Sequence, residues 1–224
     1  MSIRSSAEKV NGSSSNKSLY VYAFLRDVHR LIAMAYAETD PTQQKATVEE
    51  VITQRIVEEI IKLTEATDSP PWTRRYTATD NLPLSFPGKP GKQRPRIDIE
   101  ILGLSGRPRP RFHFEAKRLG KGNAVGTYLG PKGLGCFVAG RYARNSEEAG
   151  MLGYVQASTC DSWAEKIRRS ITKYPAKYAV VTGTDWETVQ IAPECTDAYR
   201  TQHDRASAKR IVRVYHTLLL FHDG

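Results

Sequence analysis

Residues 94–119 read RPRIDIEILGLSGRPRPRFHFEAKRL, and the expected architecture follows from this stretch. Its first half alternates aliphatic with acidic side chains over residues 97–101, and its second half alternates Phe, Phe and Ala with His, Glu and Lys over residues 112–117. A period of two sends successive side chains to opposite faces of a β-strand. Turn-forming residues at 105–108 separate the two halves. The sequence therefore predicts two strands joined as a hairpin.

Three charged residues stand in the middle of these strands: Asp98, Glu115 and Lys117. A charge flanked by strand-core residues needs a partner, because an unpaired buried charge is costly. Two carboxylates on adjacent strands offer the hard oxygen ligands that Mg²⁺ prefers, and a lysine beside them can orient or help deprotonate an attacking water. The alternative is an ordinary hairpin in which the acids pair with nearby cations, namely Arg94, Arg96, Lys117 or Arg118.

Two helices are predicted before the hairpin. One begins near Leu19 and ends before Pro41, and a clearer one follows Thr47, where apolar residues recur at steps of three and four. Thr47 with Glu50 has the T-x-x-E pattern of a capping box, which marks a helix start. Residues 74–81 have the composition of a short strand, and the Pro- and Gly-rich residues 82–95 predict a loop.

The segments after the hairpin predict a loop, two helices and further strands. Six glycines between residues 120 and 135 indicate a long loop near the cleft. Helices are expected over 145–156 and 161–174, and compact apolar strands over 177–183 and 186–191. Residues 210–221 are expected to form a final strand or short helix. This order predicts a single α/β domain over 19–224, with a mixed central sheet flanked by helices.

Composition limits the function classes. The 224 residues carry 33 Lys and Arg against 24 Asp and Glu, a net charge of +9, which is typical of proteins that bind phosphate-rich partners. Ten of these cations and only three acids lie between Lys89 and Lys121. Serine-rich residues 1–18 predict a disordered tail. We expect a cytoplasmic protein without a membrane span or signal peptide, whose three cysteines are reduced thiols.

The pattern Asp98…Glu115-Ala116-Lys117 on a hairpin that follows a helix resembles the PD-(D/E)xK nucleases, also called the restriction-endonuclease-like superfamily. The resemblance covers roughly residues 47–191, and its motif is short and degenerate. The proline that names the motif is missing, since Ile97 precedes Asp98. The resemblance implies an αβββαβ core.

The resemblance also implies roles for individual residues. Asp98, Glu115 and the carbonyl of Ala116 would bind Mg²⁺ or Mn²⁺, and Lys117 would be catalytic. Family members often add an acid from the preceding helix, for which Glu49 is the candidate, with Glu59 as alternate and Glu50 assigned to the capping box. Six residues are expected to contact nucleic acid: Arg94, Arg96, Arg118, Lys121, Arg141 and Gln156, the last on the helix that follows the ExK strand.

These expectations define a metal-dependent nuclease that acts on DNA in preference to RNA, of the kind found in restriction, repair or anti-phage defence, and gated by a partner protein or by homo-oligomerisation. The alternative is a non-catalytic module that binds nucleic acid or a partner on the same fold. His113 is expected to be a solvated strand residue, and His203 with Arg205 to lie in a surface turn. No GxSxG, HExxH or P-loop motif is present.

Overall fold

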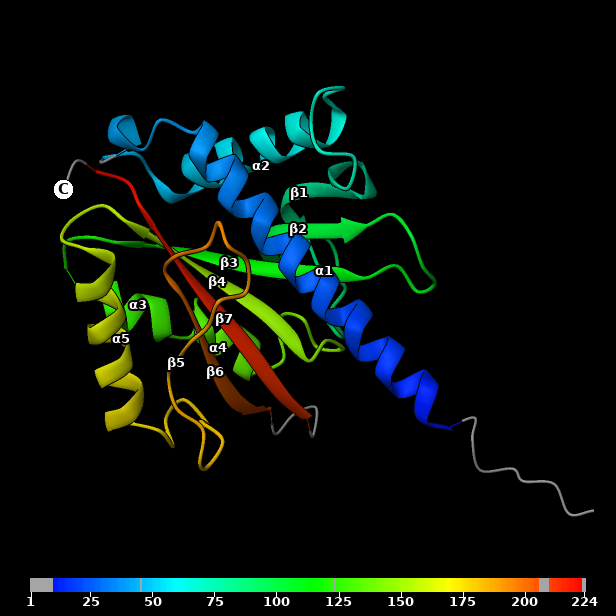
Figure 1. The fold of residues 1–224 in the computed structure, drawn as a ribbon. Coiled ribbons are helices and arrows are strands. Elements are labelled where there is room, and N and C mark those ends of the chain that lie inside the picture. The colour runs from blue at the N-terminus through cyan, green and yellow to red at the C-terminus, as the bar shows by residue number, and fades with distance from the viewer. Residues whose placement is uncertain (1–9, 45, 123, 206–209, 223–224) are drawn as a thin grey trace, which may run out of the picture.

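A mixed sheet of seven strands forms the centre of the computed structural model, which describes residues 10–44, 46–122, 124–205 and 210–222 (Figure 1). The spatial order is β1-β2-β3-β4-β7-β6-β5. Strands β3, β4 and β7 run parallel to one another, and every other neighbouring pair is antiparallel. The strands are β1 (Tyr76–Pro83), β2 (Arg96–Gly103), β3 (Arg111–Leu119), β4 (Glu148–Val155), β5 (Glu187–Thr188), β6 (Ala198–Arg205) and β7 (Arg210–Leu220).

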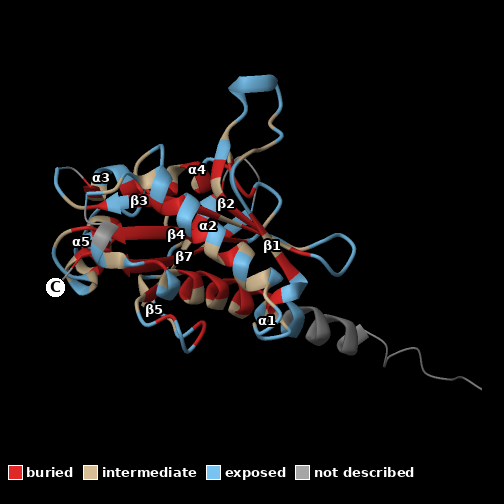
Figure 2. Cartoon of the chain, turned by 90° about the horizontal axis from the view of Figure 1, so that it is seen from above, coloured by how far each residue is buried: buried red, intermediate tan, exposed pale blue. Residues whose placement is uncertain are grey.

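Helices cover both faces of this sheet, as the α/β prediction requires. Helices α1 and α2 pack on one face through a core that includes Ile56, Phe112 and Tyr154, and α3, α4 and α5 pack on the other through Met151 and Ile167. Figure 2 shows the strands buried between these two layers. The helices are α1 (Val10–Glu38), α2 (Glu49–Glu65), α3 (Ala124–Leu129), α4 (Leu134–Val138) and α5 (Cys160–Lys173), with short 3-10 turns η1 (Pro41–Gln44), η2 (Thr73–Arg75) and η3 (Gly91–Gln93).

The predicted hairpin is confirmed. Strands β2 and β3 pair antiparallel, with Ile99 opposite Phe114 and Ile101 opposite Phe112. These side chains are fully or almost fully buried against α1 and α2. Alternation then sends Asp98, Glu115 and the other polar residues of both strands to the opposite face.

The predicted helix over 145–156 is wrong, because most of this segment is strand β4. All eight residues of β4 are buried, since the strand lies between β3 and β7 with both faces covered. Strands buried on both faces lack the alternating pattern that identifies half-exposed ones. Gly150 and Gly153 provide the space for neighbouring side chains: a Cβ at Gly150 would collide with the rings of Phe112 and Phe114.

The glycine-rich segment also differs from its prediction as a loop. Helices α3 and α4 form within residues 120–138, and Tyr128 and Phe137 anchor them with fully buried rings. Over residues 177–191 the predicted strands reduce to the two-residue β5 and an isolated bridge between Val180 and His203. The last predicted element is confirmed as a strand, β7.

The surface turn predicted around His203 and Arg205 is also wrong. Both residues lie on β6 and are fully buried. Arg205 donates to the carbonyl oxygens of four residues, so its charge is solvated by the backbone: Phe137, Ala143, Arg144 and Ser146.

Two predicted helix starts differ as well. Helix α1 begins at Val10, within the segment predicted to be a disordered tail, while residues 1–9 lie outside the described ranges. Residues 10–18 extend a helix whose later turns pack in the core. Each residue added to an existing helix gains one backbone hydrogen bond. Helix α2 begins at Glu49 with Val48 as N-cap and no side-chain cap, so the Thr47–Glu50 capping box is wrong.

Within the described ranges, no helix combines the length and apolar character needed to cross a bilayer. Cys136, Cys160 and Cys195 are free thiols, as predicted.

Candidate functional site

Three carboxylates surround one ammonium group at the carboxyl end of β3. The Nζ atom of Lys117 lies 2.7 Å from Glu49 Oε1, 2.9 Å from Glu115 Oε1 and 3.6 Å from Asp98 Oδ2. It also donates to the carbonyl oxygen of Ala116. Lys117 and Glu115 are buried, whereas Asp98 and Glu49 keep 30% and 23% of their side-chain surface exposed. The cluster is therefore open to solvent on the side of Asp98 and Glu49.

The hairpin register explains how Asp98 reaches the cluster. The pairing of β2 with β3 runs from Leu102 opposite Arg111 to Ile99 opposite Phe114, so Asp98 is the first residue of β2 beyond it. The Oδ2 atom of Asp98 accepts a hydrogen bond of 2.7 Å from the backbone N–H of Ala116. This bond fixes the Asp98 carboxylate against β3.

Glu49 comes from a different element, the first turn of α2. One of its oxygens accepts from Lys117, and the other accepts from the backbone N–H of Arg118 at 3.0 Å. Glu49 is thus the residue that joins α2 to the site. The two other acids considered on this helix do not join it: Glu50 is exposed, and Glu59 pairs with Lys62 at 2.6 Å.

Burial and mutual proximity control the protonation of this cluster. Burial and the neighbouring Asp98 carboxylate raise the pKa of Glu115 to about 8, against the opposing effect of Lys117. Burial lowers the pKa of Lys117, but the attraction of Glu115, Asp98 and Glu49 outweighs it, so the pKa lies above its ordinary value. Lys117 is therefore a permanent cation and a hydrogen-bond donor near neutral pH, and not a base.

The donor set fits a hard divalent cation. Asp98, Glu115 and the carbonyl of Ala116 present oxygen atoms of the kind Mg²⁺ prefers. The Oε2 atom of Glu115 is buried and has no hydrogen-bond partner, so one oxygen at the centre of the cluster lacks a compensating group. Over the described ranges, however, no group of three or more His, Cys, Asp and Glu side chains is arranged to hold a metal ion. The Lys117 ammonium is the cation that pairs with the carboxylates in this arrangement.

A polar pocket of about 660 Å³ adjoins the cluster. Arg118 and Lys121 contribute exposed cations to it, and the side-chain amide of Gln156 donates to the carbonyl oxygen of Thr47 across it. Gln156 follows β4 directly and does not lie on a helix, which corrects its predicted position. The pocket is lined by Ala46, Glu49, Arg118, Gly120, Lys121, Ala124, Thr127, Gln156 and Ala157.

Three predicted nucleic-acid contacts lie outside this pocket. Arg94 and Arg96 are exposed near the start of β2, where Arg96 donates to the carbonyl oxygen of Asn81. Arg141 donates to the carbonyl oxygen of Pro131, so its side chain ties the loop after α4 to the loop before it. Arg141 therefore acts as a loop anchor.

Other residues near the site differ from expectation or were missed. His113 is not solvated, because its Nε2 lies 2.8 Å from Glu100 Oε2 and its side chain is 13% exposed. Thr127 of α3 lines the pocket but was not predicted to do so, because its helix lies in the glycine-rich segment. Burial, more than the charge of Glu115, raises the pKa of the buried Tyr142.

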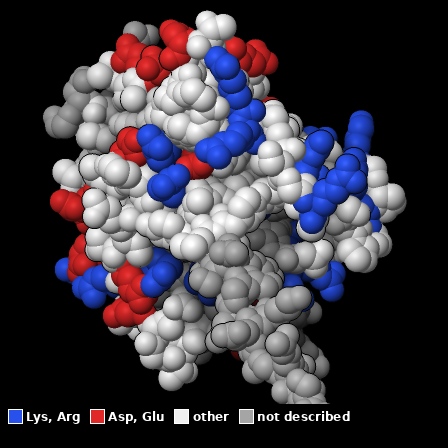
Figure 3. Space-filling model, turned by 45° about the vertical axis from the view of Figure 1, so that its right-hand side comes forward, with Lys and Arg blue, Asp and Glu red and all other residues white. Residues whose placement is uncertain are grey.

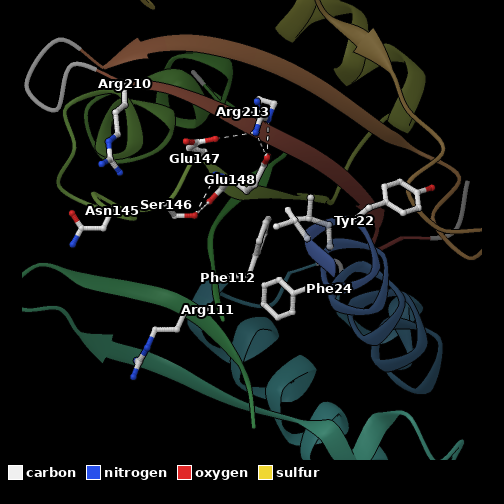
Figure 4. Close-up of a pocket in the computed structure, with 12 residues that line it drawn as sticks. Tyr22, Phe24, Arg111, Phe112, Asn145, Ser146, Glu147, Glu148, Arg210 and Arg213 are labelled. Atoms are coloured by element: carbon white, nitrogen blue, oxygen red, sulfur yellow. Dashed lines mark hydrogen bonds and ion pairs between the residues drawn. The ribbon is translucent and has the colours of Figure 1, made fainter. Parts of the chain in front are cut away.

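A second pocket, of about 820 Å³, lies at the other end of the parallel strands (Figure 4). Phe24 of α1 and Phe112 of β3 line one side, and Asn145 and Arg210 line the other. In the same pocket Arg213 pairs with Glu148 and Glu147. The pocket and the cluster lie at opposite ends of β3. Arg111, which lines the pocket, begins this strand, and Lys117 lies near its end.

Lys and Arg are not distributed evenly over the surface. Figure 3 shows one face on which they gather in separate patches, one of which, on the right, has no acidic side chain beside it. The fold and the cluster together define an α/β protein with a mixed open sheet and an acidic–lysine site at the end of a central strand. No protein-family model, curated protein or solved structure matches the chain.

Proposed function

We propose that the chain is a Mg²⁺-dependent nuclease of the PD-(D/E)xK type that hydrolyses phosphodiester bonds in DNA. The observation that carries this proposal is the convergence of Glu49, Asp98, Glu115 and Lys117 from a helix and two strands. These four residues come from three separate segments of the chain, and an ordinary hairpin salt bridge does not require the acid from α2.

The order of elements supports the same proposal. Helix α2 precedes the antiparallel strands β1, β2 and β3, and β4 then returns parallel to β3 after the short helices α3 and α4. This order corresponds to αβββαβ, although its second helix and fourth strand lie earlier in the chain than the sequence predicted. Ligands of open α/β sheets commonly bind at the carboxyl ends of strands, where this cluster lies.

Each residue has a role under this proposal. Asp98, Glu115 and the Ala116 carbonyl would hold Mg²⁺, which supplies charge neutralisation and a more acidic water when bound. Lys117 donates hydrogen bonds, so it orients the attacking water and stabilises negative charge that develops on the phosphate. Glu49 holds the Lys117 ammonium in position, and Arg118 with Lys121 attracts the phosphate backbone into the adjoining pocket.

A second candidate is a non-catalytic nucleic-acid-binding module on the same fold. One observation favours it: the Lys117 ammonium already lies within 4 Å of all three carboxylates and serves as their cation. Dependence on metal separates the two candidates, because a binding module retains its affinity in EDTA and cleaves nothing.

The deciding experiment incubates wild-type, Asp98→Asn and Lys117→Ala proteins with supercoiled plasmid, linear duplex, single-stranded DNA and RNA, each with Mg²⁺, Mn²⁺ or EDTA. We expect the wild type to cut DNA only with metal, and both variants to lose at least about 100-fold in rate. Glu50→Ala is the matched control, because Glu50 is an exposed acid adjacent to Glu49. Equal rates in wild type and both variants contradict the proposal, and so does cleavage in EDTA.

A further inference from the structure

A basic loop projects from the sheet between β1 and β2. Residues 84–95, called the basic arm here, stand away from the body of the molecule in Figure 2. The backbone N–H of Leu84 donates to the carbonyl oxygen of Pro95 at 2.8 Å and closes the base of the arm. Within it, backbone bonds run from Lys89 to Phe86 and from Gln93 to Pro90. The arm is therefore held together by its own turns.

The arm carries cations without acids. Lys89, Lys92 and Arg94 are exposed, and no Asp or Glu occurs between Asp80 and Asp98. None of the three forms an ion pair with a carboxylate in the described part of the chain. Lys89 lies over the ring of Phe86, and Arg94 Nε donates to the carbonyl oxygen of Gly91. These three charges are available to an anionic partner.

Chain connectivity brings the root of the arm beside the acidic cluster. The arm ends at Pro95, three residues before Asp98, whose Oδ2 atom lies 3.6 Å from the Nζ atom of Lys117. The arm thus leaves the sheet at the edge where β2 begins and Asp98 lies. With about six residues in each limb, it reaches at most about 20 Å from that edge. This reach exceeds the width of a major groove, about 12 Å.

The composition of the arm favours a double-stranded partner over a single strand. Proteins that bind single strands stack successive bases on aromatic side chains. The arm contains one aromatic residue, Phe86, which is half-buried and faces Lys89. An arm that carries cations but lacks aromatic side chains for base stacking suits a duplex, in which the bases are already stacked and the phosphates face outward.

We propose that the basic arm binds the phosphate backbone of double-stranded nucleic acid and so makes the duplex the substrate of the adjoining site. The inference rests on the proposed function in taking nucleic acid as the partner. It goes further in assigning double-stranded substrate and the arm that selects it.

The test measures binding without cleavage, by fluorescence anisotropy in EDTA with a 20-bp DNA duplex, the matching 20-bp RNA duplex and a 20-nucleotide single strand. The variant combines Lys89→Ala, Lys92→Ala and Arg94→Ala. We expect it to lose at least about tenfold in duplex affinity at 100 mM salt. We also expect the negative slope of log K against log[salt] to become shallower by about 2.7, since each phosphate contact contributes about −0.9.

The control variant combines Lys166→Ala, Lys173→Ala and Lys177→Ala, three exposed cations on α5 or just after it. It removes the same charge and is expected to keep duplex affinity within about twofold. The inference is overturned if the arm variant binds the duplex like the wild type, if the control loses as much, or if the single strand binds as tightly as both duplexes. Loss of RNA-duplex binding alone assigns the arm to RNA and contradicts the DNA substrate of the proposed function.

The two proposals fail separately. If the wild type binds the duplex through the arm but cleaves nothing with metal, the nuclease proposal is contradicted and the arm proposal is retained. If the wild type cleaves DNA and the arm variant binds and cleaves equally well, the arm proposal is contradicted and the nuclease proposal is retained.

Discussion

Lys117 shares its ammonium group among carboxylates from three elements, and this arrangement sets what the residue can do. A lysine whose pKa lies above its ordinary value donates hydrogen bonds at every pH at which the protein is folded. The contribution of Lys117 to the proposed catalysis then depends on the position of its Nζ atom. The Ala116 carbonyl and the Glu49 carboxylate hold Nζ from two sides, so Glu49 is a positioning residue.

Replacing Glu49 by Ala tests that role at the scale of one residue. The change removes one acceptor of Lys117 and the acceptor of the Arg118 backbone N–H. We expect the rate of DNA cleavage to fall about 100-fold through misplacement of Lys117. The free energy of unfolding should change by less than about 2 kcal/mol, because the carboxylate is partly exposed and one like charge leaves the cluster. Cleavage kinetics and urea unfolding measure the two effects.

Rescue makes this prediction specific. Glu49→Gln keeps an oxygen that can accept from Lys117 and should recover part of the lost rate, whereas Glu59→Ala, on the same helix but paired with Lys62, should cleave like the wild type. An E49A protein with wild-type cleavage would remove Glu49 from the site.

Asp98, Glu115 and Lys117 could be predicted because the pattern that identifies them lies within single strands. Alternation along two strands singled out Asp98, Glu115 and Lys117, whereas Glu49 was a candidate because the resemblance implies an acid on the preceding helix. The buried positions of His203 and Arg205 could not be predicted in this way, because carbonyl groups from segments about 60 residues away along the chain solvate Arg205. Nothing adjacent in the sequence records those partners.

At the scale of elements, β4 shows how tertiary packing overrides a helical pattern. The strand is buried on both faces, and its two glycines let aromatic and aliphatic side chains of neighbouring strands approach its backbone. A sequence rich in Ala, Gly, Met and Leu carries no alternation that reveals this environment. The helices α3 and α4 were missed for the opposite reason, since glycines suggested a loop where buried Tyr128 and Phe137 anchor helical turns.

Gly150→Ala tests the packing of β4. The new methyl group would lie 2.8 Å from the ring of Phe112 and closer still to that of Phe114, nearer than real Cβ atoms approach. Overpacking of this kind costs about 1–3 kcal/mol. We expect the free energy of unfolding in urea to fall by that amount, with the midpoint shifting and the slope unchanged.

Gly120→Ala is the comparison for this substitution, because its new Cβ would find only the Cβ of Gln156, at 3.8 Å. That variant should stay within about 0.5 kcal/mol of the wild type. Equal stability of G150A and wild type would mean that β4 does not pack against Phe112 and Phe114 as described.

At the scale of the whole molecule, a buried chain of hydrogen bonds ties α3 to the far half of the sheet. His203 Nδ1 can only donate to the carbonyl oxygen of Tyr178, so its Nε2 accepts from the Thr201 hydroxyl. The same hydroxyl oxygen then accepts from His216 Nε2, and His216 Nδ1 accepts from the Tyr128 hydroxyl. Both imidazoles are therefore neutral, and each has one defined tautomer.

Burial makes these rings resist protonation. It lowers the pKa of His203 to about 4 and that of His216 well below its ordinary value, and it also lowers the pKa of His29, on the other face of the sheet, to about 4. In the unfolded chain each histidine titrates near 6.5. Between about pH 6.5 and 4 the unfolded state therefore binds more protons than the native state, so stability falls as the pH falls through this window.

The resulting prediction concerns the pH dependence of unfolding. From pH 7 to pH 5, His29 and His203 should each remove about 2 kcal/mol from the free energy of unfolding. Urea titrations at pH 8, 7, 6 and 5 measure the loss, and NMR signals of the imidazole rings in the native protein should show no titration of His29, His203 or His216 above pH 5. His203→Gln should flatten the profile by the contribution of one histidine. A free energy that stays constant between pH 7 and pH 5, or native rings that titrate near 6.5, would contradict the neutral buried chain and the packing that encloses it.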